Sequence, residues 1–241
     1  MGSAFDLVVG SGRLVAKEMD FTDFSVVEVG HAFEVKITRS DSYKVSITAD
    51  DNLFDYIKAT KTNEKLRIGL KSGYSYRSAT LRARIAMPDL YGLKFSGATR
   101  GTVEGFSSSH SLTLDMSGAS SLKFADTSVG DVEADLSGGS RVTGVLKASG
   151  EARLSPSGAS KVELQGAAND LRIRATGASH LKMPDFPVHN ANIELSGASQ
   201  ATINLDGRLD AHLSGASGLR YIGEPTMGDV STSGASRIRR S

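Results

Sequence analysis

Two aspartates hold equivalent positions in successive copies of a short repeat, and paired carboxylates are the first candidates for chemistry. Asp115 and Asp135 each lie three residues before the glycine of a Ser-Gly-Ala-Ser tetrapeptide or a close variant of it. If the copies stack, the two carboxyl groups lie within several ångströms, where they could act as acid and base or bind calcium. The simpler interpretation is two solvated acids on an outward face near Lys94 and Arg174. We favour it, because charged pairs are often structural.

A second candidate set is basic and lies three residues after the repeat glycine. Five copies of the repeat have a basic residue or histidine at this position, namely Arg100, Arg141, Lys161, His180 and Arg237. The other three copies have Ser121, Gln200 and Gly218 there. A basic stripe on one wall of the protein could bind a sulfated or uronic polysaccharide, or anionic lipid headgroups. The alternative is a solvated face that aids solubility. Arg100, Arg141, Lys161 and His180 are our candidate binding residues.

The repeated serines and the histidines do not form a recognisable catalytic set. A serine nucleophile needs a base and an orienting acid, and no Gly-x-Ser-x-Gly elbow is present. None of the histidines has a metal-binding spacing such as His-Glu-x-x-His, although His180 and His189 could converge across one loop. The absence of cysteine excludes disulfides and thiolate metal sites. We therefore predict a non-enzymatic protein without metal or cofactor.

The repeat itself predicts the elements that position these residues. Successive repeat glycines are separated by 21, 20, 20, 19, 20, 18 and 19 residues. A period near 20 residues is typical of stacked-repeat proteins, in which each repeat buries its face on its neighbours. Glycine supplies a backbone conformation closed to other residues, or lets a neighbouring coil approach closely. We predict a structural corner formed by Gly97, Gly118, Gly138, Gly158, Gly177, Gly197, Gly215 and Gly234.

Apolar residues alternate with polar ones on both sides of each glycine. Before Gly118 the apolar positions are Leu112, Leu114 and Met116, and after it they are Leu122 and Phe124. This period of two indicates strands with one buried face. Each repeat therefore reads as strand, bend, strand and turn, and the chain as an all-β solenoid with about 20 residues per coil. An antiparallel meander would need Asn-Gly or Asp-Gly hairpin turns, which Ser-Gly-Ala-Ser matches poorly.

The first part of the chain has the strand pattern without the tetrapeptide. Alternating segments occur from 27 to 29, 33 to 37, 43 to 47, 66 to 70 and 81 to 85, and residues 50–60 could form a short helical turn over one end. The terminal repeats of solenoids usually differ in sequence from the central repeats, because they cap the stack. We divide the chain into an N-terminal cap with degenerate first coils (4–90) and a continuous regular solenoid (91–241). Arg240 replaces an apolar residue in the last copy, which predicts an exposed edge at the C-terminus.

Composition narrows the classes of partner. The 241 residues include 28 basic and 27 acidic side chains and carry a net charge of +1, which argues against a dedicated nucleic-acid binder. No segment approaches the roughly 20 apolar residues of a membrane span. The start, Met1-Gly2-Ser3, lacks the pattern of a signal peptide, so an export signal is not present in this sequence.

Several segments resemble a bacterial family described as "putative auto-transporter adhesin, head GIN domain". The resemblance rests on Pro88-Asp89-Leu90, on the segment from Leu93 to Thr99, and on the upstream strands at 33–37 and 45–52, and it spans roughly residues 14 to 240. It implies a right-handed parallel β-helix, a location in the cell envelope or outside the cell, and no catalytic residues. We therefore expect adhesion, surface binding or scaffolding, with a polysaccharide or an envelope or host surface protein as partner. Self-association through the solenoid faces or end is a further hypothesis, and a polysaccharide lyase or hydrolase acting on one face is the alternative function.

Overall fold

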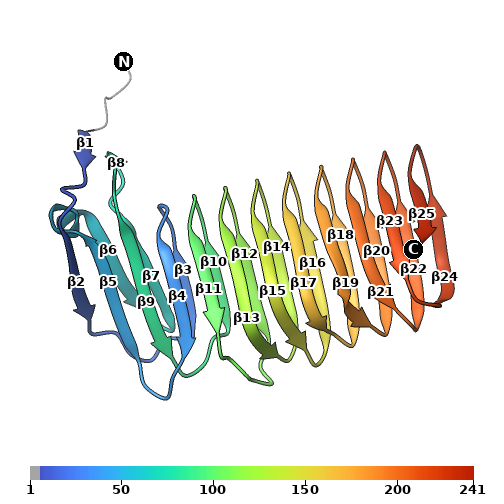
Figure 1. Cartoon of the computed structure of the whole chain (residues 1–241), viewed down its shortest axis with the longest axis horizontal. Coiled ribbons are helices and arrows are strands. Elements are labelled where there is room, and N and C mark those ends of the chain that lie inside the picture. Colours follow the sequence, from blue (N-terminus) through green and yellow to red (C-terminus); the bar gives the residue numbers. More distant parts are fainter. Residues whose placement is uncertain (1–5) are drawn as a thin grey trace.

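The computed structural model describes residues 6–241 and shows a rod of stacked β-coils (Figure 1). Two long sheets run along the rod, and from β10 onward every pairing between neighbouring strands is parallel. The predicted all-β solenoid is therefore confirmed. Residue 4, where the predicted N-terminal part begins, lies outside the described residues.

The 12-stranded sheet carries the residues that follow each corner. From the N-terminal end of the rod its strands are β2 (Leu14–Met19), β5 (Lys44–Asp50), β9 (Leu81–Met87), β4 (Glu34–Arg39), β11 (Arg100–Glu104), β13 (Ser121–Val129), β15 (Arg141–Ala148), β17 (Lys161–Ala167), β19 (His180–Val188), β21 (Gln200–Leu205), β23 (Gly218–Ile222) and β25 (Arg237–Arg240).

The 11-stranded sheet carries the residues that precede each corner. Its strands in the same direction are β6 (Ile57–Thr62), β7 (Lys65–Leu70), β3 (Val26–Val29), β10 (Gly92–Phe95), β12 (Leu112–Met116), β14 (Val132–Leu136), β16 (Glu151–Pro156), β18 (Asp170–Ala175), β20 (Asn190–Leu195), β22 (Arg208–Leu213) and β24 (Thr226–Thr232). A small third sheet pairs β1 (Asp6–Val9) with β8 (Tyr74–Arg77).

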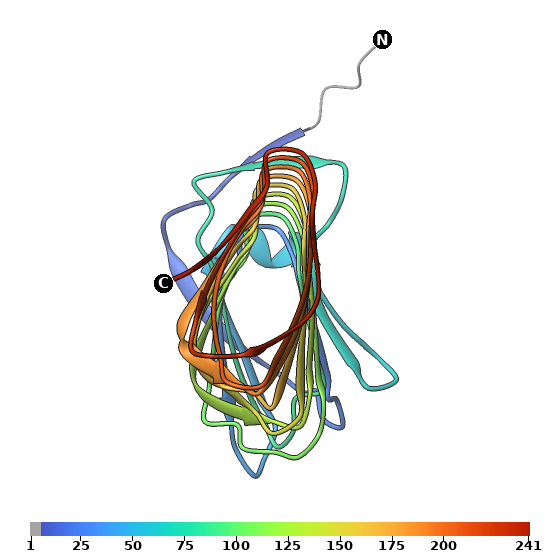
Figure 2. The same ribbon diagram turned by 90° about the vertical axis from the view of Figure 1, so that its right-hand side faces the viewer.

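The two long sheets face each other and enclose a single core (Figure 2). Along most strands of these sheets the inward side chains are buried and the outward ones are more exposed, as in β14, where Val132, Ala134 and Leu136 alternate with Glu133 and Asp135. This burial of one side chain in two is the origin of the alternation in the sequence. The outward columns therefore form the two broad faces of the rod.

The repeat glycines lie in one file along a corner of the rod. All eight have φ between 69° and 73°, the left-handed region that glycine adopts without strain. Each corner also hydrogen-bonds to the preceding coil, as Ala119 N does to Gly97 O at 2.7 Å. Glycine is required here for both of the reasons given by the sequence, its positive φ and the close approach of the neighbouring coil.

The second serine of most tetrapeptides turns its hydroxyl inward, where the hydroxyl donates a hydrogen bond to a backbone carbonyl of the bend. Ser140 Oγ donates to Ser137 O at 2.7 Å, and the same bond recurs in other copies. The column is almost fully buried from Thr99 through Ser120 to Ser217. These hydroxyls have a structural role, because each is buried and is paired with a carbonyl of its own bend.

The first coils are not stacked in sequence order. Strand β3 pairs with β7 on one side and β10 on the other, and β4 likewise lies between β9 and β11. The coil formed by β7 and β9 therefore lies outside the coil formed by β3 and β4, although it follows that coil in sequence (Figure 1). The chain then returns through residues 88–91 to begin the regular repeats. Antiparallel pairings of β2 with β5, β5 with β9 and β6 with β7 complete this end.

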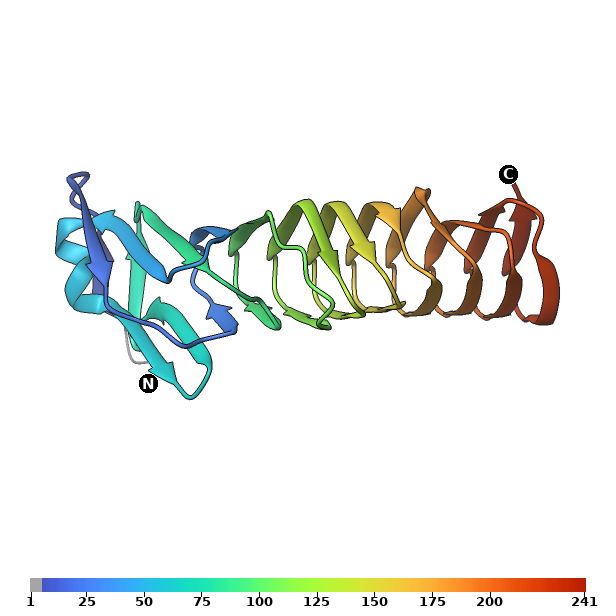
Figure 3. The ribbon, with the colours of Figure 1, turned by 90° about the horizontal axis from the view of Figure 1, so that it is seen from below.

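The two ends of the rod differ (Figure 3). At the N-terminal end the 3-10 helix η1 (Asp51–Tyr56), which falls within the predicted helical turn, buries Leu53 completely. At the C-terminal end β24 and β25 form the last coil, and Met227 and Val230 are exposed there. Within residues 6–241, η1 thus covers the N-terminal end of the solenoid, and no further element covers β24 and β25.

Candidate functional site

The outward side of the 12-stranded sheet gathers basic side chains into two parallel columns. The first column contains the candidate binding residues, because strand register places Arg100, Ser121, Arg141, Lys161, His180, Gln200, Gly218 and Arg237 side by side on successive strands. It continues toward the N-terminal end through Glu34 and Arg82. All of its charged residues are exposed.

A second basic column runs beside the first, two residues further along each strand. In spatial order it contains Arg84, Lys36, Thr102, Lys123, Thr143, Glu163, Lys182, Thr202, Arg220 and Arg239. The alternating pattern already marks these positions as outward, but sequence reasoning did not group them with the first column. The membership of Arg82, Arg84 and Lys36 in these columns could be recognised only from the structure, because the order of the first coils does not follow the sequence.

We call these two columns together the basic face. Its cationic members are Arg82, Arg84, Lys36, Arg100, Lys123, Arg141, Lys161, Lys182, Arg220, Arg237 and Arg239, and His180 lies among them. The acids within the two columns are Glu34 and Glu163. The net charge of +1 for the whole chain therefore conceals a strong local excess of positive charge.

Few cations of the basic face are neutralised by acids of the same chain. Arg82 pairs with Glu34 at 3.2 Å, and Lys36 pairs with Glu104 at 2.9 Å. Within residues 6–241, no carboxylate oxygen lies within 4.0 Å of a side-chain nitrogen of His180 or of the other basic-face cations, namely Arg84, Arg100, Lys123, Arg141, Lys161, Lys182, Arg220, Arg237 and Arg239. These groups are available to an external anion.

The outward side of the 11-stranded sheet, which we call the mixed face, has a different arrangement of charge. From β10 to β22 its cations are paired with acids on the same or nearby strands, as Arg208 is with Asp210 and Arg174 with Glu194 at 3.3 Å. The hydrogen bond from Arg208 lowers the pKa of Asp210 below its usual value. Charge on this face is largely compensated internally.

The two aspartates considered as a catalytic pair lie on the mixed face. Asp115 on β12 and Asp135 on β14 are direct neighbours across the two strands, as stacking predicts. Asp115, however, accepts a hydrogen bond from Lys94, and this bond raises the pKa of the Lys94 amine. Asp115 therefore stands in a structural ion pair of the kind that the simpler interpretation describes.

The histidines do not converge. His180 begins β19 and His189 follows its last residue, so the two rings lie at opposite ends of a nine-residue strand. His180 Nδ1 lies 3.0 Å from Ala178 O, and His189 Nδ1 lies 2.9 Å from Asp206 Oδ1. The hypothesis of a His180–His189 site is wrong, because the strand between them is extended. No group of three or more His, Asp or Glu residues within 6–241 has the geometry of a metal site.

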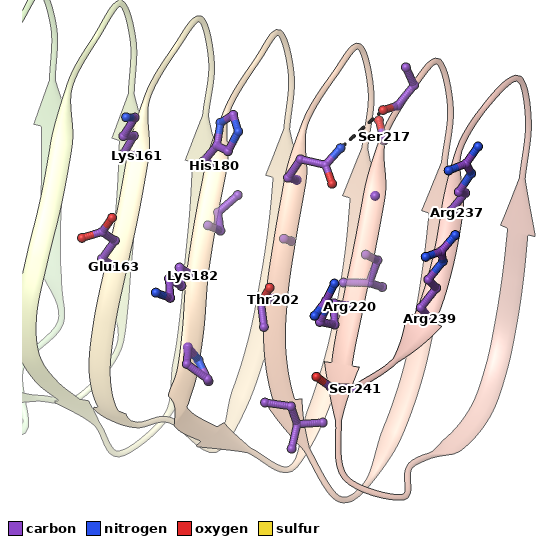
Figure 4. Close-up of a pocket in the computed structure, with 18 of the residues that line it drawn as sticks. Lys161, Glu163, His180, Lys182, Thr202, Ser217, Arg220, Arg237, Arg239 and Ser241 are labelled. Atoms are coloured by element: carbon purple, nitrogen blue, oxygen red, sulfur yellow. Dashed lines mark hydrogen bonds between the residues drawn. The ribbon is translucent and has the colours of Figure 1, made fainter.

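The basic face is hollowed near its C-terminal end (Figure 4). The hollow has a volume of about 730 Å³, and Lys161, His180, Lys182, Arg220, Arg237 and Arg239 are among the residues that line it. Two further depressions occur on the same sheet, one beside Arg82, Arg84 and Arg100 and one beside Lys36 and Lys44. The basic face is therefore an extended surface with shallow hollows along its length.

The chain matches the family model described as "Putative auto-transporter adhesin, head GIN domain" over residues 23–225. The chain belongs to this family. The match covers the reordered first coils and the regular coils as far as β23, within the span of 14 to 240 expected from the sequence, so the resemblance to the family is confirmed. No curated protein matches the chain.

Solved structures from Parabacteroides species and from Bacteroides fragilis share this fold. A "putative adhesin" from Parabacteroides merdae superimposes with a TM-score of 0.87 at 20% identity, covering 98% of this chain and 99% of that chain. A "putative adhesin" and a "putative lipid binding protein" from Parabacteroides distasonis give TM-scores of 0.90 and 0.87, each at 18% identity and covering 98% of this chain and 100% of theirs. At these identities the likeness shows the fold alone.

No helix within residues 6–241 has the length and hydrophobicity needed to span a bilayer.

Proposed function

We propose that this adhesin-family protein is a non-enzymatic surface-binding protein of the cell envelope or the extracellular space, and that its basic face binds an anionic surface polymer. The observation that carries the proposal is the set of exposed, unpaired cations aligned in two columns along the rod. Positive charges arranged in this way attract a polyanion and raise its local concentration at the surface. The descriptions of the similar structures as adhesins are consistent with this role.

The rod form suits binding to a polymer more than binding to a small molecule. Cations recur on successive strands about 4.8 Å apart, so a long ligand meets many of them at once. Each exposed contact is weak on its own, since solvent and salt screen it. Binding strength then comes from the number of contacts, as in other multivalent systems.

A polymer-binding assay tests this proposal. We expect the protein to bind labelled polygalacturonate or chondroitin sulfate, to bind neutral dextran far more weakly, and to lose affinity as salt is raised. The triple variant Arg84→Gln, Lys123→Gln, Arg141→Gln removes three cations of the basic face and is expected to weaken binding about tenfold or more. The matched control Arg67→Gln, Arg153→Gln, Arg172→Gln removes three cations of the mixed face and is expected to leave binding within about twofold, because these arginines lie on the opposite side of the rod.

Several outcomes contradict the proposal. Equal loss of binding in both triple variants would show that the basic face has no special role. Shortening of the polymer during incubation would show an enzyme. Tighter binding to double-stranded DNA than to any polysaccharide, or binding only to an envelope protein, would assign the surface to another class of partner.

A further inference from the structure

The hollow on the basic face lies where two strands interrupt the first column with uncharged residues. Between His180 on β19 and Arg237 on β25, the intervening positions are Gln200 and Gly218. In the second column Thr202 separates Lys182 from Arg220. Gly218 and the short side chain of Thr202 therefore stand between longer side chains, and the space above them is the hollow of about 730 Å³ (Figure 4).

The lining of the hollow offers three kinds of contact. Cationic side chains stand on both sides of it, with Glu163 as the acid in its lining. The Gln200 amide lies over Gly218 and donates one long bond, 3.4 Å, to Ala216 O, so most of its hydrogen-bonding capacity is free. Pro184 and Ile222 add apolar surface. Charge, amide or hydroxyl groups and apolar patches together match a sugar ring that carries an acid group.

Resting on the proposed function, we propose that this hollow is the anchoring subsite for an acidic polysaccharide, and that the polysaccharide lies along the rod axis. One uronic or sulfated sugar residue occupies the space above Thr202 and Gly218. Its acid group contacts Lys182 or Arg220, and its hydroxyls contact Gln200 and Thr202. The following residues of the polymer reach Lys161 and then Arg141 in the first column.

The direction of the polymer follows from the direction in which the basic residues extend over the face. Along the axis, Arg141, Lys161 and His180 occupy consecutive strands, about 4.8 Å apart. Across the axis near the hollow, the next outward positions beyond the second column hold the uncharged Asn204 and Ile222. A polyanion lying along a strand meets only two columns of cations, whereas one lying along the axis meets cations on β15, β17, β19, β23 and β25.

The structure favours a polysaccharide over a membrane surface as the occupant. Proteins that bind at a bilayer surface usually insert Trp, Phe or Leu side chains beside their cations. The large hydrophobic residues exposed within 6–241 are Leu7, Val9, Leu14, Tyr74, Tyr91, Met227 and Val230, and none of them lines the hollow. The hollow is also concave, which suits a ring better than a flat headgroup layer.

The decisive experiment fills the hollow without changing its charge. Thr202→Phe places a ring in the hollow on an outward strand position that tolerates aromatic residues. Thr113→Phe makes the same change at an exposed outward position of β12 on the mixed face, away from the basic face and outside the hollow lining. We expect Thr202→Phe to weaken binding of a labelled oligogalacturonate about tenfold, which corresponds to about 1.4 kcal/mol, and Thr113→Phe to change it by less than about twofold.

A charge variant gives a second, independent measurement, which also serves if Thr202→Phe fails to fold. Lys182→Gln combined with Arg220→Gln is expected to weaken oligogalacturonate binding, and Lys182→Arg combined with Arg220→Lys is expected to retain it. Because the polymer runs along the axis, affinity is also expected to rise with oligomer length, and Arg141→Gln is expected to reduce that gain.

The outcomes separate this inference from the proposed function. Polymer binding that is lost in the Arg84, Lys123, Arg141 triple variant but unchanged by Thr202→Phe overturns the subsite and leaves the proposed function standing. Absence of binding to every anionic polysaccharide overturns both. Binding to phosphatidylglycerol vesicles that exceeds binding to oligogalacturonate, and that Thr202→Phe does not affect, assigns the basic face to a membrane instead.

Discussion

The α-carbon of Gly138 faces the carbonyl oxygen of Gly118 on the preceding coil so closely that an added Cβ would lie 2.6 Å from it. The same relationship recurs at the other stacked corners, from Gly118 over Gly97 to Gly234 over Gly215. Backbone atoms cannot move aside as a flexible side chain can, so the corner excludes every residue but glycine. This contact explains why one residue type is kept at this position through repeats that otherwise vary.

Gly138→Ala is expected to destabilise the protein by about 2 kcal/mol or more. The substitution combines a positive φ of 71°, which costs an L-residue about 1–2 kcal/mol, with the contact to Gly118 O. Urea denaturation followed by circular dichroism measures the effect. The neighbouring Gly139→Ala is the matched control, because its Cβ would meet Gly118 O at 3.9 Å and the other copies have alanine there. We expect Gly139→Ala to stabilise by about 0.4–1 kcal/mol, and equal effects of the two changes would contradict this account of the corner.

Ser160→Ala tests the buried serine column. Ser160 is fully buried and its hydroxyl donates to Ser157 O at 2.7 Å, so its loss leaves a carbonyl without this partner. We expect a loss of about 1–3 kcal/mol in the free energy of unfolding. Ser236→Ala removes the same bond, to Ser233 O, in the last coil, where water can replace the hydroxyl. Its effect is expected to be smaller, and a larger one would show that burial does not set the cost.

The regular coils could be predicted from the sequence because each repeat contains the residues that determine its own corner and strands. The glycine marks the corner, and the alternation on either side of it, as in Leu114 and Met116, marks the buried face. Parallel stacking then follows, since identical corners align only when equivalent residues lie on adjacent coils. This reasoning uses only contacts between residues that are one repeat apart in the sequence.

The first coils could not be ordered in this way. Placing β3 between β7 and β10 depends on pairings such as Val27 with Leu66 and with Leu93, and one apolar strand without a corner motif resembles another. The same limit applied to the basic face. The column of Arg100 and Lys161 follows from one repeat position, whereas the contribution of Arg84 appears only when β9 takes its place beside β4.

Asp210 provides a prediction about pH. Its carboxylate accepts hydrogen bonds from Arg208 and from the backbone N–H of Asp229 at 2.7 Å, and these bonds hold its pKa below the usual 3.8. Because the pKa of Asp210 is lower in the folded than in the unfolded protein, ionised Asp210 stabilises the pairing of β22 with β24 above pH 3.8. That contribution is lost as the pH falls through the folded pKa.

An NMR titration of the Asp210 carboxyl carbon measures this effect. We expect a midpoint below 3.8 in the unsubstituted protein and a higher midpoint in Arg208→Gln, because the side-chain hydrogen bond from Arg208 is the largest cause of the shift. Asp51, whose pKa is lowered by hydrogen bonds from Ser11 and Arg13 at the other end of the rod, is expected to keep its midpoint in Arg208→Gln. An unchanged midpoint for Asp210 would show that Arg208 does not hold the carboxylate in solution.

The unequal ends of the rod predict unequal local stability. In a solenoid each coil is stabilised by its neighbours, and the last coil, β24 and β25, has a neighbour on one side within the described chain. Its apolar residues, among them Met227 and Val230, are partly exposed, whereas Leu53 under η1 is fully buried. We expect amide hydrogen exchange to be slow in the middle coils and fastest in β24 and β25.

Two variants make this gradient testable. Deletion of residues 226–241 is expected to leave exchange in β12–β21 unchanged, because those strands keep both neighbours. Leu53→Ala is expected to cost about 2–5 kcal/mol and to raise exchange in β5 and β6 first, since it opens a cavity beneath the cap. Uniform protection up to Arg240 would contradict the gradient. If that protection disappeared on dilution, a second copy would be covering the open coil, and the rod would self-associate through its C-terminal end.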